Sequence, residues 1–488
     1  MILEENKARI RHLLDFCLES YNRSDLERML RYASLLGSSA WFAHAGFYAH
    51  PPMERLLSQA AAKLKVPNRR SPWALPGAAG DGRRWLHVLS TAYPTGGHTR
   101  LAERWMLGAL PGERHSCVLL HQEGLPCPDW LVRAAVSTGG AFHIFPPGVP
   151  YLDKAAWLRQ MAYEGADVVV LHAHPDDPVP SVAFGIPGGP PVWIVNHAAH
   201  TFWYGPNIAD TIIDFREPEA AFSYRRRYAK RVDTLPMPLK PRPLSADKAE
   251  FKRRLGIPAH WTTLVTIASS YKFVPFGGYH FPATVGDVVA RHSDCALLVV
   301  GVYPDDPHWQ EAVAATGGRI RLCGLQADVE PYYGAADVFL ESFPFGSITA
   351  AMDAAMLGIP VMLALEPLDP ILGLSRYPGM MPRPVSIEQY REQLASFIRQ
   401  PVWRHEYGRT VMASVAGRHS DASWKEQLRQ LIAHRPKAHA VGIGDSPMAD
   451  AETELDRYWA QMQRFDGTFG ILVRKFEQFN REFGGSGS

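Results

Sequence analysis

A short segment near residue 350 has the residue types and spacing of a phosphate-binding turn. An apolar strand pattern runs into Ser-Phe-Pro-Phe-Gly-Ser347-Ile348-Thr349 and then into a helix-forming stretch. Backbone N–H groups at a helix start have no partner within the helix, so Ser347, Ile348 and Thr349 are placed to bind a diphosphate. Asp353 follows Thr349 by one helical turn and could bind a ribose hydroxyl. The segment therefore predicts a binding site for a sugar nucleotide that needs no metal ion.

Two other features could complete this nucleotide site. Lys272 follows the first strand pattern of the second half of the chain, and its ammonium could neutralise a leaving diphosphate. A solvated loop lysine is the alternative interpretation. Gly324, Leu325 and Gln326 form a turn after another strand pattern, and the backbone of this turn could contact the edge of a base.

A glycine-rich loop follows the first strand pattern of the first half. Gly96 and Gly97 allow close backbone approach to a ligand at the start of the next helix, and His98 comes directly after them. The loop lacks the third glycine of the dinucleotide fingerprint. A tight turn would explain the two glycines but not the histidine.

Histidines and aromatic residues follow two later strand patterns of the first half. They are His172, His174, Asn196, His197, His200, Trp203 and Tyr204. A neutral histidine can take a proton from a hydroxyl near pH 7. We expect His98, His197 or His200 to serve as the base or to position the acceptor, and the other residues to line an acceptor pocket. The alternative is a metal site formed by His172, His174, His197 and His200. Because the sequence contains no D-x-D motif of the kind that binds a metal with a sugar nucleotide, we predict no metal.

The pattern of elements around these residues predicts two α/β domains. Short apolar runs alternate with helical stretches from residue 85 onward, and the alternation restarts after a proline-rich linker at 236–243. Such alternation is typical of parallel sheets covered on both faces. We therefore predict two doubly wound, Rossmann-like domains, with a cleft between the carboxyl ends of their strands. The first spans 76–240 and is assigned to the acceptor, and the second spans 241–434 and is assigned to the donor nucleotide.

The two ends of the chain differ from this alternation. Residues 1–75 have helical periodicity and are expected to form a helical cap. Residues 435–483 read as a linker followed by an amphipathic helix with apolar residues spaced three and four apart. This helix is expected to pack as a strap across the domains or to form a homodimer contact, with a membrane-surface helix as the weaker alternative. The Gly-Ser run at 484–488 has the composition of an appended linker.

Composition limits the choice of partners and of compartment. The 488 residues are 46% hydrophobic and 20% charged, and the net charge of +2 gives no sign of nucleic-acid binding. No secretory signal and no membrane-spanning run is visible. The five cysteines are scattered and form no metal-type pair, so a reducing compartment, the cytoplasm, is expected.

The second half of the chain resembles a known family. Tyr271-Lys272, the turn at 324–326 and the run from Ser342 to Asp353 resemble the catalytic domain of O-linked N-acetylglucosamine transferases and bacterial protein N-glucosyltransferases. This resemblance implies the GT-B architecture, with Lys272 and Thr349 on donor phosphate, the turn on uracil and Asp353 on ribose. The family's His-Thr-Thr run is here Ile-Thr-Ala, and the cap is too short for a tetratricopeptide array. The first half is similar to uncharacterised bacterial sugar transferases, which implies no particular acceptor.

We therefore expect a metal-independent glycosyltransferase with a nucleotide-diphosphate sugar, assigned as UDP-linked, as co-substrate and no other cofactor. Inversion at the sugar carbon is only what the resemblance implies. A sugar-nucleotide epimerase of the same fold is the second possibility, and it would act on UDP-sugar alone. A non-catalytic partner protein that retains a nucleotide site is the third, and it would bind nucleotide without turnover.

Overall fold

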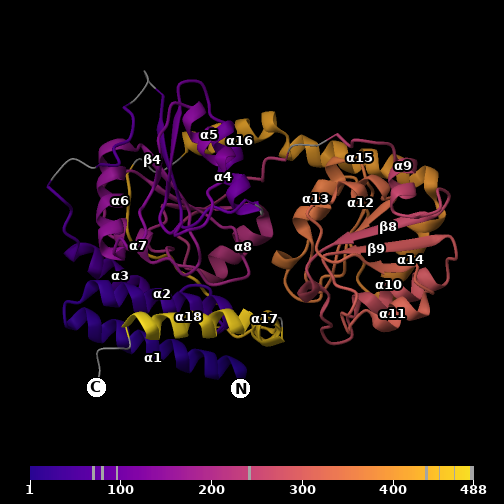
Figure 1. Ribbon diagram of the computed structural model, residues 1–488, viewed down its shortest axis with the longest axis horizontal. Coiled ribbons are helices and arrows are strands. Elements are labelled where there is room, and N and C mark those ends of the chain that lie inside the picture. The colour runs from indigo at the N-terminus through magenta and orange to yellow at the C-terminus, as the bar shows by residue number, and fades with distance from the viewer. Residues whose placement is uncertain are drawn as a thin grey trace. The chain divides into compact units, whose positions relative to one another are not determined.

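The chain divides into two compact units in this computed structural model (Figure 1). Unit 1 comprises Met1–Pro238 and Lys425–Ser488, and unit 2 comprises Leu239–Trp424. The structure describes residues 1–68, 72–77, 82–94, 97–239, 243–434, 438–449, 451–465 and 468–483. The Gly-Ser run at 484–488 and part of the predicted proline-rich linker lie outside these residues.

Unit 1 is built on a seven-stranded parallel sheet, sheet A, in the order β3-β2-β1-β4-β5-β6-β7. Its strands are β1 Arg84–Leu89, β2 Arg114–Leu119, β3 Phe142–Ile144, β4 Val168–His172, β5 Val192–Val195, β6 Thr211–Asp214 and β7 Val232–Thr234. This is the doubly wound order, in which the chain reverses direction across the sheet between β1 and β4. The strands β6 and β7 were not predicted.

Helices cover both faces of sheet A, which explains why β1, β4 and β5 read as nearly continuous apolar runs. One face packs on α4 and α5 through residues such as Leu89, Cys117 and Leu119. The opposite face, with Leu86 and Val88, packs in a large core with the N-terminal helices. Five helices of unit 1 come from the middle of the chain: α4 Gly97–Leu107, α5 Asp129–Ser137, α6 Tyr151–Gly165, α7 Val179–Ala183 and α8 Glu217–Arg226.

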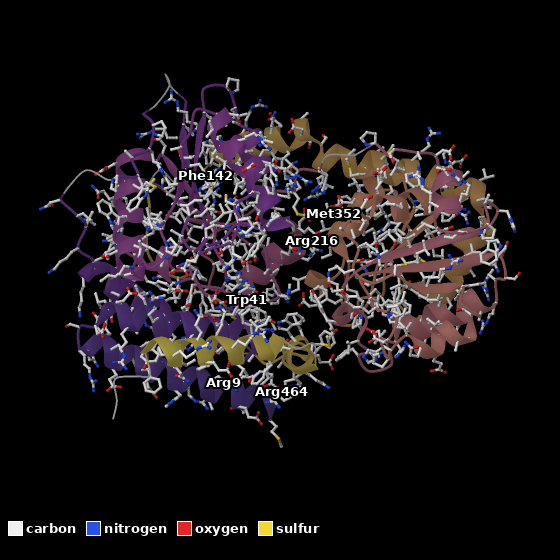
Figure 2. The ribbon with its side chains drawn as sticks, viewed as in Figure 1. Arg9, Trp41, Phe142, Arg216, Met352 and Arg464 are labelled. Carbon is white, nitrogen blue, oxygen red and sulfur yellow. The ribbon has the colours of Figure 1, made fainter. Side chains whose placement is uncertain are left out.

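Helices from the two ends of the chain form a shared layer in unit 1, in which α18 lies beside α2 (Figure 1). The layer contains α1 Ile2–Asn22, α2 Leu26–Phe42, α3 Pro51–Lys63, α17 Glu454–Phe465 and α18 Thr468–Phe483. The apolar side of α18 is covered by this layer: Leu472 is buried with Phe42 and Ala43. The guanidinium of Arg9, marked in Figure 2, lies 5.4 Å from the Phe469 ring.

This packing bears on the role expected for the terminal helix. The seam that we assigned to a strap or a dimer contact packs against α2 of the same chain. Association of two copies through α18 stays a prediction. No helix within the described ranges has both the length and the apolar character needed to cross a bilayer.

Unit 2 is built on a five-stranded parallel sheet, sheet B, in the order β10-β9-β8-β11-β12. Its strands are β8 Thr262–Ile267, β9 Cys295–Val300, β10 Ile320–Leu322, β11 Val338–Leu340 and β12 Val361–Met362. All five were predicted within a few residues. The order repeats that of sheet A, with the change of direction between β8 and β11.

The helices of unit 2 flank this sheet, and α16 Asp421–Ala433 passes from unit 2 into unit 1. They are α9 Lys248–Arg254, η1 Ser270–Phe273, α10 Phe281–Ala290, α11 Gln310–Ala315, α12 Glu330–Ala335, α13 Ile348–Met356, η2 Pro370–Leu372, α14 Ile387–Arg399 and α15 Pro401–His419. Residues 425–434, which we placed in the second domain, are grouped with unit 1. The division of the chain into five parts, at 1–75, 76–240, 241–434, 435–483 and 484–488, remains a prediction.

Candidate functional site

Lys272 lies at the carboxyl edge of sheet B, beside the strand pair where the chain reverses direction. Its ammonium donates a hydrogen bond to the Gly346 carbonyl, 2.8 Å away, and lies 4.7 Å from the centre of the Phe345 ring. Burial lowers the pKa of Lys272 to about 8, and the carboxylate of Glu341 opposes this shift. The loops after β8 and β11 therefore meet at the edge where open α/β sheets bind ligands.

The helix start predicted to bind phosphate is present at α13. Ser347 precedes the helix as its N-cap, and its side chain caps no backbone N–H of the helix. Its hydroxyl instead accepts a long hydrogen bond, 3.4 Å, from the Ser342 amide. Thr349 is exposed and Ile348 is half-buried, and Met352, labelled in Figure 2, is buried one turn after Ile348. The first turn of α13 thus presents N–H groups and an exposed hydroxyl.

A buried carboxylate fixes the loop that precedes α13. Glu341 is fully buried and accepts hydrogen bonds from the amides of Ala364, at 2.8 Å, and Leu374. A Cβ at Gly346 would lie 2.5 Å from the Leu372 carbonyl oxygen and 2.6 Å from Glu341, so only glycine fits there. Our sequence reasoning missed this support. The signal that could have indicated it is a carboxylate, Glu341, directly after the apolar strand pattern.

The turn assigned to the base lies at the end of β10, on the same edge of sheet B. Gly324 has φ of +64°, a conformation that favours glycine, and its amide donates to the Val302 carbonyl at 2.8 Å. The Gln326 side chain is used locally, since its amide donates to the Cys323 carbonyl at 2.5 Å. Leu325 is 77% exposed, so the tip of the turn is open to a ligand.

Asp353 is half-buried on α13, one turn beyond Thr349 as predicted. The hydroxyl of Tyr333 donates to the Ala350 carbonyl at 3.0 Å, in the first turn of the same helix. Burial raises the pKa of Tyr333, and the nearby Asp353 carboxylate raises it further. Lys272, the 324–326 turn and the α13 residues therefore gather at one edge of one sheet.

A second polar group lies at the carboxyl edge of sheet A. Gly96 lies outside the described residues, whereas Gly97 begins α4. A Cβ at Gly97 would meet no described residue within 4 Å, so packing among these residues does not explain this glycine. The next residue, His98, places its ring 4.5 Å from the His197 ring, measured between centroids.

The protonation of His98 follows from its partner. Its Nε2 lies 2.7 Å from the His172 carbonyl oxygen, which can only accept, so Nε2 carries the hydrogen. Its Nδ1 is buried and has no hydrogen-bond partner among the residues that the structure describes. Burial lowers the pKa of His98 to about 4, so the ring is neutral and Nδ1 offers a lone pair.

The other predicted residues of sheet A have different surroundings. His172 and His197 are joined through ring nitrogens 3.0 Å apart, and His174 stacks on Tyr93 at 5.7 Å. His200 packs edge-on against Trp459 at 4.8 Å. Of the predicted histidines, His98, His172 and His197 therefore lie together, whereas His200 lies apart from them beside α17.

Asn196, Trp203 and Tyr204 are core residues. The Asn196 amide donates to Asp214 at 2.6 Å, and its oxygen accepts from the Trp203 indole at 3.2 Å. Tyr204 donates to the Ala33 carbonyl at 2.7 Å, and both aromatic residues are only 6% exposed. This burial argues against the role in lining an acceptor pocket that we predicted for the two rings.

A network that sequence reasoning missed holds the loop after β4. Asp177 accepts from the Ser90 hydroxyl at 2.6 Å and contacts His121 at 3.3 Å. The Ser90 hydroxyl in turn accepts from the His174 amide at 2.9 Å. Burial would raise the pKa of Asp177, but His121 and these hydrogen bonds lower it to about 2. The carboxylate is therefore ionised and fixes the backbone at His174.

The alternative of a histidine metal site can be compared with this geometry. Both ring nitrogens of His172 are already paired, with His87 at 3.2 Å and with His197 at 3.0 Å. Across the ranges that the structure describes, no group of three or more His, Cys, Asp or Glu is arranged to hold a metal ion.

Known structures share this architecture. No protein-family model and no curated protein sequence matches the chain. HepE from Anabaena, solved with UDP and glucose, is 12% identical with a TM-score of 0.52, covering 72% of this chain and 99% of HepE. A mutant O-GlcNAc transferase from Thermobaculum terrenum is 13% identical with a TM-score of 0.53, covering 90% of this chain and 79% of that one. A glycosyltransferase from Rickettsia africae is 12% identical with a TM-score of 0.53, covering 72% and 98% respectively.

These likenesses establish the fold. The chain has the GT-B architecture of glycosyltransferases, with two doubly wound parallel sheets and an additional helical layer. The predicted fold class and the predicted resemblance to glycosyltransferases, including O-GlcNAc transferase, are confirmed at this level. At such identities the fold alone is shared, so the reaction must be argued from the site.

Proposed function

We propose that this protein is a glycosyltransferase that moves a sugar from a UDP-linked donor to an acceptor without a metal ion. The observation that carries the proposal is the meeting of Lys272 with the start of α13 at the carboxyl edge of sheet B. An ammonium and a row of free N–H groups together match a diphosphate, which carries negative charge and accepts hydrogen bonds. HepE, a structure of similar fold, was solved with UDP-glucose, which supports UDP as the nucleotide.

The proposed donor site assigns one role to each group. Lys272 and the N–H groups at Ser347, Ile348 and Thr349 bind the diphosphate and stabilise the charge that develops on it as the sugar leaves. Asp353 binds a ribose hydroxyl, and the backbone of the turn at 324–326 contacts the base. These parts give the leaving diphosphate a positive environment, and this is why no metal is required.

The proposed acceptor site lies at the carboxyl edge of sheet A. His197 or His98 removes the proton from the acceptor hydroxyl, since both rings are neutral and His98 offers an unpartnered Nδ1. The glycine loop that includes Gly97 contributes to diphosphate binding. His174 lines the acceptor pocket, whereas we now assign Asn196, Trp203 and Tyr204 to support.

The cysteines support a proposal about the compartment. All five cysteines are free in the structure. We propose a cytoplasmic location, where thiols remain reduced.

A thermal-shift panel tests the proposal. A ligand that binds only the native state raises the unfolding midpoint, so UDP and UDP-sugars should raise it in buffer that contains EDTA. Asp353→Asn should reduce the shift with UDP, whereas Asp287→Asn, in a surface pair with Arg391, should leave it unchanged. No response to UDP, GDP or dTDP sugars would overturn the proposal. Conversion of UDP-sugar to its epimer without an acceptor would replace transfer with epimerisation.

A further inference from the structure

Four histidines form a continuous row across sheet A. They lie on neighbouring strands or directly after them: His115 in β2, His87 in β1, His172 at the end of β4 and His197 after β5. His115, His87 and His172 are fully buried. Only His172 and His197 were predicted as site residues, because His87 and His115 are single polar residues within apolar strand patterns. We call these four residues the histidine row.

The rings of the histidine row are joined nitrogen to nitrogen. His115 Nδ1 lies 2.9 Å from His87 Nε2. His87 Nδ1 lies 3.2 Å from His172 Nε2, and His172 Nδ1 lies 3.0 Å from His197 Nε2. In each contact, Nε2 of the ring nearer His197 therefore faces Nδ1 of the ring nearer His115.

This head-to-tail order couples the tautomers of the four rings. A neutral imidazole has one N–H donor and one lone pair, so a chain of N···N hydrogen bonds requires the same tautomer in every ring. Either all four rings carry hydrogen on Nε2, or all four carry it on Nδ1. The group beyond His115 decides between these two states.

Glu113 is that group. Its Oε2 lies 3.6 Å from His115 Nε2, an ion-pair contact longer than a hydrogen bond, and accepts from the Leu110 amide at 2.9 Å. Burial would raise the pKa of Glu113, but His115 and the Leu110 amide lower it below its ordinary value. An ionised carboxylate can only accept, so it favours hydrogen on Nε2 of His115 and of the rings beyond it. At the far end, Nδ1 of the partly exposed His197 is left with a lone pair, and it has no hydrogen-bond partner within the described residues.

We propose that Glu113 and the histidine row form a proton relay, in which Glu113 orients the four rings and accepts the proton equivalent that His197 Nδ1 takes from the acceptor hydroxyl. The proposal deepens the proposed glycosyltransferase function and rests on it. His197 is the catalytic residue, and Glu113, His115, His87 and His172 act through it.

Each step of the relay breaks one bond to hydrogen and forms another. The acceptor O–H bond breaks as N–H forms on His197 Nδ1, and the hydrogen on His197 Nε2 moves to His172 Nδ1. The same exchange passes through His87 and His115, whose Nε2 hydrogen moves to Glu113 Oε2. The freed electron pair of the acceptor oxygen forms the new bond to the sugar carbon, and the old C–O pair leaves with the diphosphate. When product leaves, the proton returns along the row to water at His197, which restores the tautomers.

The burial of the row explains why the proton would not stop midway. Burial lowers the pKa values of His87 and His172 well below the ordinary value, with neighbouring histidines lowering them further. A positive charge is therefore unfavourable on an inner ring. Glu113 also lines a cavity of about 440 Å³ with Thr138 and Met106, so the carboxylate end lies beside a space that can admit water.

Nitrogen NMR tests the order of the tautomers without requiring activity. In protein labelled with ¹⁵N-histidine, couplings across the N–H···N bonds should link four rings, all neutral with hydrogen on Nε2. Glu113→Leu should shift all four rings together toward hydrogen on Nδ1. Mixed tautomers in the wild-type protein, or an unchanged order in a folded Glu113→Leu variant, would overturn the proposal. Even if the variant does not fold, the wild-type spectrum alone shows whether all four rings carry hydrogen on Nε2.

Kinetics then test whether the row acts in turnover. Two rings, His87 and His172, separate His115 from His197. His115→Phe should nevertheless lower the turnover number for UDP-sugar hydrolysis or transfer at least about 10-fold while UDP affinity stays unchanged. His143→Gln, on β3 and outside the row, is the matched control and should alter neither. Equal turnover in His115→Phe and wild-type protein would overturn the relay. Absence of any nucleotide-sugar binding would instead overturn the proposed function, while the spectra still report the order of the rings.

Discussion

The ammonium of Lys272 donates a hydrogen bond to the carbonyl oxygen of Gly346, 2.8 Å away. Lys272 comes from the loop after β8 and Gly346 from the loop after β11, so this bond joins the two loops at the point where sheet B reverses direction. The carbonyl is neutral and only partly compensates for burial of the ammonium, and the pKa of Lys272 stays at about 8. The site therefore holds a lysine whose charge would be stabilised by an anion.

UDP binding should take up a proton at alkaline pH. Since the pKa of free Lys272 is about 8, most of the protein at about pH 9 has a neutral lysine that a bound diphosphate would protonate. Uptake should approach one proton at about pH 9 and nearly vanish at about pH 6.5. Calorimetric titrations in buffers of different ionisation enthalpy measure it. Lys272→Met should abolish the uptake and Lys248→Met, in a surface pair with Asp337, should not; equal uptake in both variants would contradict the assignment.

His197→Gln should separate catalysis from donor binding. The variant removes the proposed base, so hydrolysis of UDP-glucose or transfer from it should slow about 10²–10⁴-fold. Affinity for UDP should be unchanged, because His197 is not among the groups assigned to the nucleotide. The exposed His260→Gln is the control and should match the wild-type protein. A loss of UDP affinity equal to the loss of turnover would argue that His197 supports binding instead.

Glu54→Gln should stabilise the protein near pH 8. Burial raises the pKa of the Glu54 carboxyl from 4.5 to about 7, and within the described part of the chain Oε2 has no hydrogen-bond partner. Between these two values the folded protein binds more protons than the unfolded chain, so Glu54 makes stability fall as pH rises from about 4.5 to about 7. A glutamine keeps an oxygen acceptor for the Gly205 amide without the charge. Melting temperatures should be higher for the variant at pH 8 than for the wild-type protein, and this difference should shrink toward pH 5.

Asp456→Ala should destabilise unit 1 strongly. This fully buried carboxylate accepts from the Tyr48 hydroxyl at 2.9 Å and from the Arg226 guanidinium at 3.1 Å. Its loss leaves a buried guanidinium without its counter-ion, at a cost of about 3–5 kcal/mol. The control Glu452→Ala removes a surface pair with Arg457 and should cost at most about 1 kcal/mol. Chemical denaturation measures both, and equal losses would contradict the reasoning.

The sequence predicted the fold well where the pattern is local. The strand patterns at 263–268 and 296–300 and the helix after Ser347 lie within a few residues of β8, β9 and α13. Long apolar runs with glycine or proline at their ends leave little choice of secondary structure. The strands β6 and β7 escaped prediction because their residues, Thr-Ile-Ile-Asp and Val-Asp-Thr, include at most two apolar ones and form no clear apolar run.

The sequence by itself determined which residues belong to the carboxyl edge of each sheet, because parallel strands place the residues that follow them at that edge. It could thus predict Lys272, Ser347 and Asp353 together, and His98 with His197. Only the tertiary structure decided that Trp203 and Tyr204 are core residues and that Glu341 holds the loop before α13. It alone also aligned His115 and His87 with His172, because strand pairing and stagger, rather than spacing along the chain, bring their rings within hydrogen-bond distance.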